Sequence, residues 1–154
     1  METPIRIYTD GGCSGNPGPG GWAYVILLQT FQGLNIIAKN KGGQRDTTNN
    51  RMELAAVIES LRLLKTMKDM PRQVTVYTDS QYVQKGISEW IINWKRNSWR
   101  TSDKKPVKNK ELWIELDSLS SEFSVKWEWV KGHDGNEYNE MCDAMTQEAI
   151  EEIR

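Results

Sequence analysis

The order of apolar and polar residues predicts β-strands in five places along the chain. Three of these segments alternate between apolar and polar residues, and two are continuous apolar runs. The predicted strands are residues 5–9, 22–28, 34–38, 74–78 and 125–129. Glycine-containing segments at residues 11–21 and 32–33 join the first three strands, which could therefore form an antiparallel meander.

Between and after these strands, apolar residues recur at intervals of three and four, which predicts helices. Residues 47–64 have this spacing, and their polar Thr-Thr-Asn-Asn start suits helix capping. Shorter helices are expected at residues 80–86, at 90–97 and around 112–119. One face of the last helix carries Tyr138, Met141, Cys142, Met145, Ala149 and Ile153.

The order of these elements predicts an α/β fold. Strands separated by helices favour parallel pairing, whereas the opening meander favours antiparallel pairing. We therefore expect a mixed sheet covered by helices. The chain has 154 residues, no internal repeat and no long linker, so residues 1–154 are expected to form a single domain.

Composition narrows the class of protein. Hydrophobic residues make up 38% and charged residues 27%, values typical of a folded globular chain. No apolar run approaches the ~20 residues of a membrane span, and the N-terminus lacks the layout of a signal peptide. Two cysteines, Cys13 and Cys142, cannot build a disulfide framework. We expect a cytoplasmic protein without membrane association.

The net charge of −1 conceals a local excess of positive charge. Residues 85–110 contain eight basic and two acidic side chains, a net charge of +6 that leaves −7 for the remainder. Four of the seven tryptophans lie in or just after this segment: Trp90, Trp94, Trp99 and Trp113. A polyanionic partner would therefore meet this segment rather than the protein as a whole.

Four carboxylates occupy suggestive positions. Asp10 ends the first predicted strand and Asp79 ends the fourth, where functional groups gather in open α/β sheets. Glu53 lies in an apolar stretch of a predicted helix, where a partly buried anion needs a partner. Asp143 follows Asn139 by four residues in the last helix, so their side chains share a face.

Each acid also has an ordinary structural explanation. Asp10 could be an Asx-turn residue, Asp79 the N-cap of the next helix, and the other two could be solvated helix positions. Clustered carboxylates without a basic partner, however, repel one another in a low dielectric. Mg²⁺ relieves that repulsion, and two such ions ~4 Å apart can stabilise both the attacking and the leaving oxygen of phosphoryl transfer.

His133 is the only histidine, so proton transfer by a histidine at neutral pH must use it. It lies in the loop between the last predicted strand and the last helix, and loops on a rigid scaffold often carry function. A lone surface histidine is nevertheless more often inert.

Several motifs resemble, in order, those of bacterial ribonuclease HI of the type 1 ribonuclease H family. The resemblance extends from about residue 5 to about residue 149, and the number and order of the motifs make it specific. The matching segments are residues 8–21 (YTDGGCSGNPGPGG), 48–54 (TNNRMEL), 78–83 (TDSQYV), 126–133 (KWEWVKGH) and 139–143 (NEMCD).

This resemblance implies a ribonuclease H-like fold: a five-stranded mixed sheet of three antiparallel N-terminal strands and two further parallel strands, with helices on both faces. It also implies an endonuclease that hydrolyses the RNA strand of RNA–DNA hybrids and leaves 5′-phosphate and 3′-hydroxyl ends. The enzyme is expected to be a monomer with one catalytic domain and a basic protrusion at about residues 88–105.

The resemblance assigns two Mg²⁺ ions to the four carboxylates, with Mn²⁺ expected to substitute. Asp10 would be the ligand shared by both ions. Glu53 and Asp79 would complete the ion near the leaving 3′ oxygen, and Asp143 would help to hold the ion that activates the attacking water. His133 matches a loop histidine thought to assist proton transfer or product release.

The resemblance also assigns contacts with the hybrid, whose ribose 2′-OH distinguishes RNA from DNA. Residues facing the minor groove would be Gly11, Cys13, Asn16, Asn49 and Gln81. Glycine allows close backbone approach because it has no Cβ. A pocket for a DNA-strand phosphate would use Thr48, Asn50 and Arg51, and its need for B-like DNA would reject duplex RNA. The protrusion would contribute Trp90, Lys95, Arg96, Trp99 and Arg100, whereas Trp94 and Trp113 are expected in the core.

One departure and three alternatives accompany this assignment. Asp134 follows His133 where the family commonly has a small neutral residue, which leaves the behaviour of that loop open. A non-catalytic hybrid-binding module is the main alternative, although a phosphate binder gains nothing from four acids. A phosphatase or phosphotransferase with an aspartyl nucleophile would commonly have a second acid at position 12, which is glycine here. A nuclease acting mainly on DNA has quite different motifs.

Overall fold

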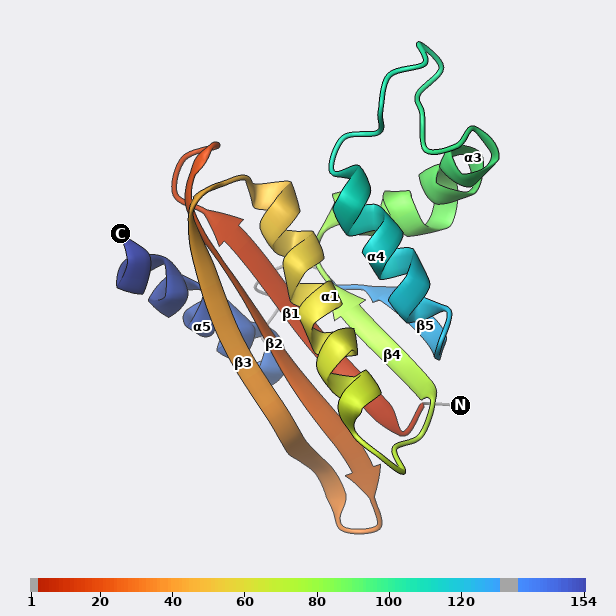
Figure 1. The fold of residues 1–154 in the computed structure, drawn as a ribbon. Coiled ribbons are helices and arrows are strands. Elements are labelled where there is room, and N and C mark those ends of the chain that lie inside the picture. Colours follow the sequence, from red (N-terminus) through yellow and green to blue (C-terminus); the bar gives the residue numbers. More distant parts are fainter. Residues whose placement is uncertain (1–2, 131–135) are drawn as a thin grey trace.

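The computed structural model describes residues 3–130 and 136–154. Five strands form one sheet in the order β3-β2-β1-β4-β5 (Figure 1). The strands are β1 (Ile5–Cys13), β2 (Gly18–Thr30), β3 (Gly33–Thr47), β4 (Gln73–Thr78) and β5 (Ser124–Trp129). The first three pair antiparallel, whereas β4 pairs parallel with both β1 and β5. The predicted five-stranded mixed sheet is confirmed.

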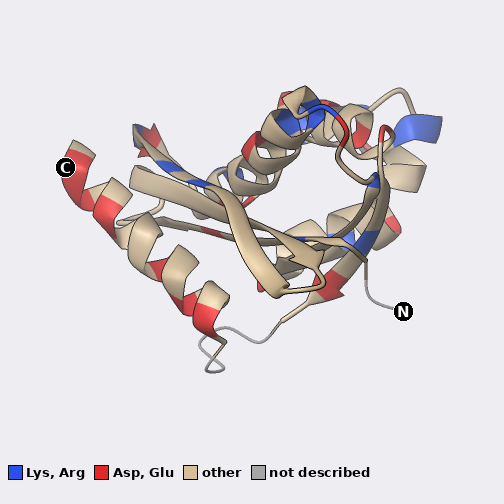
Figure 2. Cartoon of the chain, turned by 90° about the horizontal axis from the view of Figure 1, so that it is seen from below, with Lys and Arg blue, Asp and Glu red and all other residues tan. Residues whose placement is uncertain are grey.

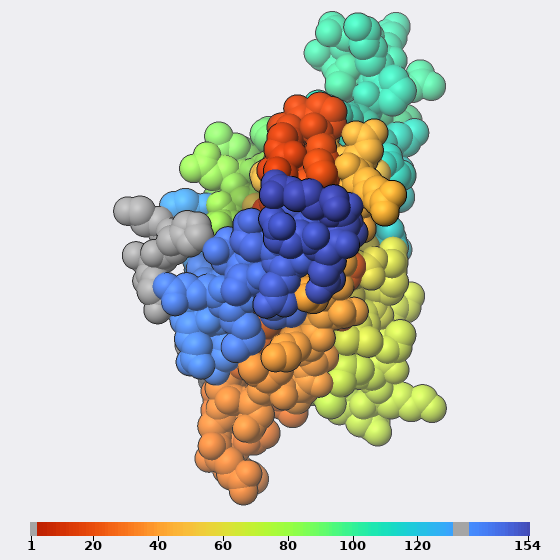
Figure 3. Space-filling model, turned by 90° about the vertical axis from the view of Figure 1, so that its left-hand side faces the viewer, coloured from red at the N-terminus to blue at the C-terminus, as the bar shows by residue number. Residues whose placement is uncertain are grey.

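Helices cover both faces of this sheet, as predicted (Figure 1 and Figure 2). They are α1 (Asn49–Thr66), α2 (Gln81–Lys85), the π-helical turn η1 (Gly86–Trp90), α3 (Ile91–Arg96), α4 (Lys110–Ser120) and α5 (Glu137–Ile153). Helices α1 and α4 lie on one face and α5 on the other. Figure 3 shows α5 across the outside of the sheet, with its C-terminal end near the β1–β2 hairpin. There the Arg154 guanidinium donates to Ser14 Oγ at 2.5 Å. No helix within the described ranges is long and apolar enough to cross a membrane.

The apolar pattern of each strand follows from which faces it buries. In β1, Ile5 and Ile7 join the core beneath α1, whereas Tyr8 joins the smaller core beneath α5. In β2, Ile26 and Val25 are both fully buried, on opposite faces. The continuous apolar run of β2 therefore reflects a strand covered on both sides, as is usual for a strand with helices above and below it.

The predicted strands of the meander end too early. β1 continues through its glycines to Cys13, because Gly12 pairs with Gly21 and Cys13 with Gly20 in the antiparallel ladder. β3 continues to Thr47 along the edge of the sheet, where most of its side chains are polar and exposed and so give no apolar signal. The glycine-rich composition after Asp10 is typical of a turn, but the backbone there is paired with β2.

The two short helices expected at residues 80–86 and 90–97 are one continuous helical segment, because η1 joins α2 to α3. The backbone at Gly86 packs against the fully buried ring of Trp113: a Cβ at Gly86 would lie 2.0 Å from that ring. A glycine that signals a helix end in the sequence therefore serves close packing here. Trp94 packs edge-on against Trp113 at 5.5 Å between ring centroids, and both belong to the core as predicted.

Candidate active site

The parallel pairing of β1 with β4 places two of the predicted acids side by side. The register pairs Tyr8 with Tyr77, and β4 ends one residue later at Thr78. Asp10 therefore lies where β1 loses its parallel neighbour, and on its other side it pairs with Ala23 of β2. Asp10 is not a turn residue and does not end its strand, so the Asx-turn alternative is wrong.

Asp79 is the first residue after β4, and its backbone is fixed from two sides. The indole of Trp129 donates to the Asp79 carbonyl at 3.3 Å, and the Val130 amide donates to Thr78 at 2.8 Å. The N-cap of α2 is Ser80, whose hydroxyl accepts from the Val83 amide at 3.1 Å. The N-cap alternative for Asp79 is therefore wrong, and its side chain lines a cavity instead.

Glu53 reaches the same place from α1, which packs closely on β1. A Cβ at Gly11 would lie 2.4 Å from the Met52 carbonyl carbon and 2.5 Å from the Glu53 nitrogen, so only glycine allows the helix this near. Glu53 is 6% exposed as a result. Gly11 therefore allows a close approach between strand and helix, and it also lines the acidic cavity, where its contact with the hybrid stays a prediction.

The three carboxylates of Asp10, Glu53 and Asp79 each offer an oxygen, and these oxygens lie within 4.8 Å of one another. Asp143 of α5 lines the same cavity, of about 390 Å³, and its charge raises the pKa of Asp10. The residues lining the cavity are Asp10, Gly11, Gly12, Asn49, Asn50, Glu53, Asp79, Ser80, Gln81, Tyr82, Asp143 and Gln147. Four separate segments of the chain thus meet at one end of β4.

This cluster is electrostatically strained as long as it holds no cation. Burial, followed by the charge of Asp79, raises the pKa of Asp10 to about 7. Burial, followed by the charges of Asp10 and Asp79, also raises the pKa of Glu53 well above its usual range. Within the part of the chain that the structure describes, Glu53 Oε1 is buried without a hydrogen-bond partner, and no Lys or Arg lines the cavity.

These observations fit a hard divalent cation. Closely spaced carboxylate oxygens, one of them buried and unpaired, are the ligands that Mg²⁺ prefers, and a cation would remove the repulsion between them. Asp10, Glu53 and Asp79 could therefore hold a metal ion.

Several predicted substrate contacts lie around this cavity. Asn49, Asn50 and Gln81 line it together with Gly11. Asn16, in the β1–β2 hairpin, accepts from the Asn49 amide at 3.1 Å and so connects the hairpin to the start of α1. The Cys13 thiol donates to the carbonyl oxygens of Gly18 and Thr47 at 3.3 and 3.4 Å.

Two residues of the predicted phosphate pocket already have partners. The Thr48 hydroxyl caps α1 by accepting from the Arg51 amide at 3.3 Å. The Arg51 guanidinium donates to Glu111 at 2.6 Å and to Asn109 at 3.1 Å. Arg51 thus joins α1 to the start of α4, a contact that no local sequence pattern predicts.

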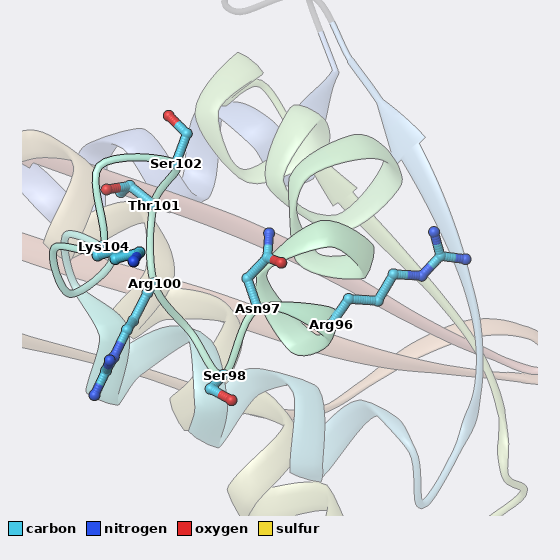
Figure 4. A pocket seen from close by; sticks show the side chains of 7 residues that line it. All are labelled: Arg96, Asn97, Ser98, Arg100, Thr101, Ser102 and Lys104. Atoms are coloured by element: carbon cyan, nitrogen blue, oxygen red, sulfur yellow. The ribbon is translucent and has the colours of Figure 1, made fainter.

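The predicted protrusion contains a second cavity, of about 580 Å³, lined by Arg96, Asn97, Ser98, Arg100, Thr101, Ser102 and Lys104 (Figure 4). Trp90 and Trp99 are half-buried and both pack against Trp94. Lys95 pairs with Asp117 of α4 at 3.2 Å. Arg96 and Arg100 also line the cavity, and Figure 4 shows their side chains extending away from each other.

His133 lies outside the described residues. The sequence reasoning missed Tyr82, Asn109 and Gln147. Tyr82 follows Gln81, lines the acidic cavity, and accepts hydrogen bonds from Trp113 and Asn109. Gln147 also lines that cavity, and its position four residues after Asp143 on one helix could have revealed it.

Comparison with known proteins gives consistent matches. A family model described as RNase H matches residues 2–151. Ribonuclease H of Treponema denticola is 50% identical to the chain, over 97% of this chain and 98% of its own length. Ribonuclease H of Bordetella bronchiseptica is 52% identical, over 97% of this chain and 91% of its own length.

Solved structures agree with these matches. LC9-RNase H1, a type 1 RNase H with the type 2 active-site motif, is similar with a TM-score of 0.86 and 29% identity, over 100% of this chain and 75% of that one. LC11-RNase H1, solved in complex with an RNA/DNA hybrid, is similar with a TM-score of 0.65 and 28% identity, over 96% of this chain and 97% of that one.

Proposed function

Because the chain belongs to the ribonuclease H family, we propose that it is an endonuclease that hydrolyses the RNA strand of RNA–DNA hybrids and leaves 5′-phosphate and 3′-hydroxyl ends. The observation that carries the proposal is the convergence of Asp10, Glu53 and Asp79 on one cavity that no basic side chain among the described residues lines. Such a cluster repels a nucleic-acid phosphate unless it first binds cations.

Two Mg²⁺ ions would be held by Asp10, Glu53, Asp79 and Asp143, with Mn²⁺ able to replace them; when bound, they would lower the pKa of an attacking water and stabilise charge on the leaving 3′ oxygen. Asp10 has neighbouring acids on several sides, which supports its role as the shared ligand. Glu53 is held in α1, and the backbone of Asp79 is held by the Trp129 indole, which donates to the Asp79 carbonyl. Asp143 approaches from α5, on the opposite side of the sheet.

The hybrid would lie across the ends of β1 and β4. Asn49 and Gln81 line the acidic cavity and offer amide groups, which can donate to and accept from a ribose 2′-OH. Cys13 and Asn16 would extend this contact along the β1–β2 hairpin. Support comes from LC11-RNase H1, which is similar over nearly its whole length and was solved with an RNA/DNA hybrid.

The remaining contacts would be with phosphates. Thr48, Asn50 and Arg51 would form the pocket for a DNA-strand phosphate, although Arg51 must first exchange its partner Glu111. On the protrusion at about residues 88–105, Arg96 and Arg100 would attract further phosphates, and Trp90 and Trp99 would support that surface. His133 would assist proton transfer or product release.

We further propose that the enzyme works as a monomer in the cytoplasm, consistent with its free thiols. The chain would act as a single catalytic domain over residues 1–154. The alternative function, hybrid binding without turnover, is less favoured because an unpaired buried acid such as Glu53 contributes nothing to a phosphate-binding surface.

The test is a digest of three labelled substrates, namely an RNA–DNA hybrid, duplex RNA and duplex DNA, with and without Mg²⁺. We expect cleavage of the RNA strand of the hybrid only, and only with the metal. Hybrid that is bound but left intact with Mg²⁺ would favour the non-catalytic module, whereas cleavage of duplex DNA would favour a DNA nuclease.

A further inference from the structure

One buried polar group beside the acidic cluster has no role in the proposed function. The Thr146 side chain is fully buried, and its hydroxyl oxygen has no hydrogen-bond partner among the described residues. A buried hydroxyl without a partner is destabilising and uncommon in folded proteins. Glu53 Oε1 is likewise buried without a partner among the described residues, and a bound cation would supply one.

The geometry of α5 places Thr146 against the part of β1 that carries Asp10. The Cys142 thiol donates to the Tyr8 carbonyl at 3.4 Å. Further along the helix, a Cβ at Gly12 would lie 3.7 Å from the Thr146 methyl group. Residues 10 and 12 point to the same face of β1 because side chains alternate along a strand. Thr146 therefore lies beside the Asp10 carboxyl.

Thr146 also shares a face of α5 with Asp143, three residues earlier, which lines the acidic cavity. A threonine within a helix often donates to the carbonyl four residues earlier, but the Thr146 hydroxyl makes no such bond. Hydrogen bonding by the Thr146 side chain acts to lower the pKa of Asp10, so the hydroxyl lies within reach of that carboxyl.

We propose that Thr146 is a positioning residue for Asp10: when a divalent cation binds, the Thr146 hydroxyl donates to the Asp10 carboxylate and turns its remaining lone pairs toward the cation. The hydroxyl has one proton to donate and can rotate to do so. Hydrogen bonds to ionised acceptors are the strong ones, so the contact gains strength when Asp10 is ionised. This inference rests on the proposed function, because it requires the metal site.

The test is calorimetric titration of Mg²⁺ into three proteins without nucleic acid: the parent, Thr146→Val and Thr146→Ser. Valine keeps the shape of threonine but removes the hydroxyl, whereas serine keeps the hydroxyl. We expect Thr146→Val to weaken Mg²⁺ binding by about ten- to a hundredfold, the effect of losing one hydrogen bond to a charged group. Thr146→Ser should bind within about twofold of the parent by the same reasoning.

Thr47→Val is the matched control. The Thr47 hydroxyl is also buried without a partner, but this residue does not line the acidic cavity. The variant Thr47→Val should therefore leave the Mg²⁺ affinity unchanged. Urea unfolding in EDTA should show that Thr146→Val is at least as stable as the parent, since a methyl group replaces an unsatisfied hydroxyl.

Equal Mg²⁺ affinities of the parent and Thr146→Val would overturn the inference while leaving the proposed function intact. Equal weakening by Thr146→Val and Thr47→Val would also overturn it, because the effect would then be one of general packing. If the parent itself neither binds Mg²⁺ nor cleaves the hybrid, the proposed function fails, and the inference fails with it.

Discussion

Among single residues, Asp10 is the one on which the proposed chemistry depends most. It lies between Glu53 and Asp79, and the charge of Asp143 acts on it as well. We expect Asp10→Asn to reduce the hydrolysis rate by about a thousandfold, because a neutral amide holds cations far less well than a carboxylate. Single-turnover kinetics with a labelled hybrid measures this. Turnover within tenfold of the parent would remove Asp10 from its role.

The same residue determines how the stability of the metal-free protein depends on pH. The pKa of Asp10 is raised to about 7 in the folded protein, whereas that of an unfolded aspartate is near 4. The folded state therefore keeps a proton that the unfolded state has lost. The stabilising contribution of this group is fully present below about pH 4 and is lost as the pH rises through about 7.

Urea unfolding in EDTA at pH 4.5 and pH 8 tests this dependence. Asp10→Asn should match the parent at pH 4.5 and exceed its free energy of unfolding at pH 8 by about 1–3 kcal/mol. Mg²⁺ should restore much of the parent's stability at pH 8, because it binds only the folded state. A variant that is no more stable than the parent at pH 8 would show that Asp10 is not under this electrostatic strain.

At the scale of helices and strands, the contact between α1 and α4 bears on substrate binding. Arg51 has Glu111 as its partner, and this ion pair lies in an exposed position, where such pairs contribute little to stability. We expect Glu111→Gln to tighten hybrid binding about two- to fivefold at low salt, because Arg51 is then free to meet a phosphate. Fluorescence anisotropy with a labelled hybrid in Ca²⁺ measures the affinity.

Glu115→Gln is the matched control for this variant. It removes the same charge from α4 one turn later, where Glu115 pairs with Arg62, away from the acidic cavity. It should leave the affinity nearly unchanged. If the two variants tighten binding equally, the effect reflects overall charge, and Arg51 does not reach the hybrid.

The elements also show why some of the site could be predicted from the sequence and some could not. Asp79 was recognisable because alternation shows where β4 ends, and Asp10 because the apolar alternation of β1 stops there, although the strand continues to Cys13. Only the β1–β4 register places the two acids side by side. Nothing local indicates that Glu111 pairs with Arg51, 60 residues away. The position of Thr146 beside Asp10 could not be predicted either, because a threonine on an apolar helix face gives no signal of what it contacts.

At the scale of the whole molecule, charge is unevenly distributed. Figure 2 shows acidic residues along α5 and basic residues on the segment around α3. We expect the double variant Arg96→Gln/Arg100→Gln to weaken hybrid binding and to reduce the slope of log affinity against log salt by about 1–2, through loss of counterion release. Affinity measured at several salt concentrations gives the slope.

The control for the loss of positive charge is the double variant Lys65→Gln/Lys68→Gln. These lysines lie in the last turn of α1 and just after it, at the opposite end of the helix from Glu53. This variant removes the same number of positive charges and should leave the slope unchanged. An unchanged slope in Arg96→Gln/Arg100→Gln would mean that the protrusion does not contact phosphates.

The most direct measurement is a crystal of this protein soaked in Mn²⁺ and recorded with anomalous scattering. The proposed function predicts a strong anomalous peak among the carboxylate oxygens of Asp10, Glu53 and Asp79, with a second near Asp143 when a hybrid is bound. Mn²⁺ peaks found only elsewhere on the surface, with these carboxylates empty at saturating metal, would contradict it.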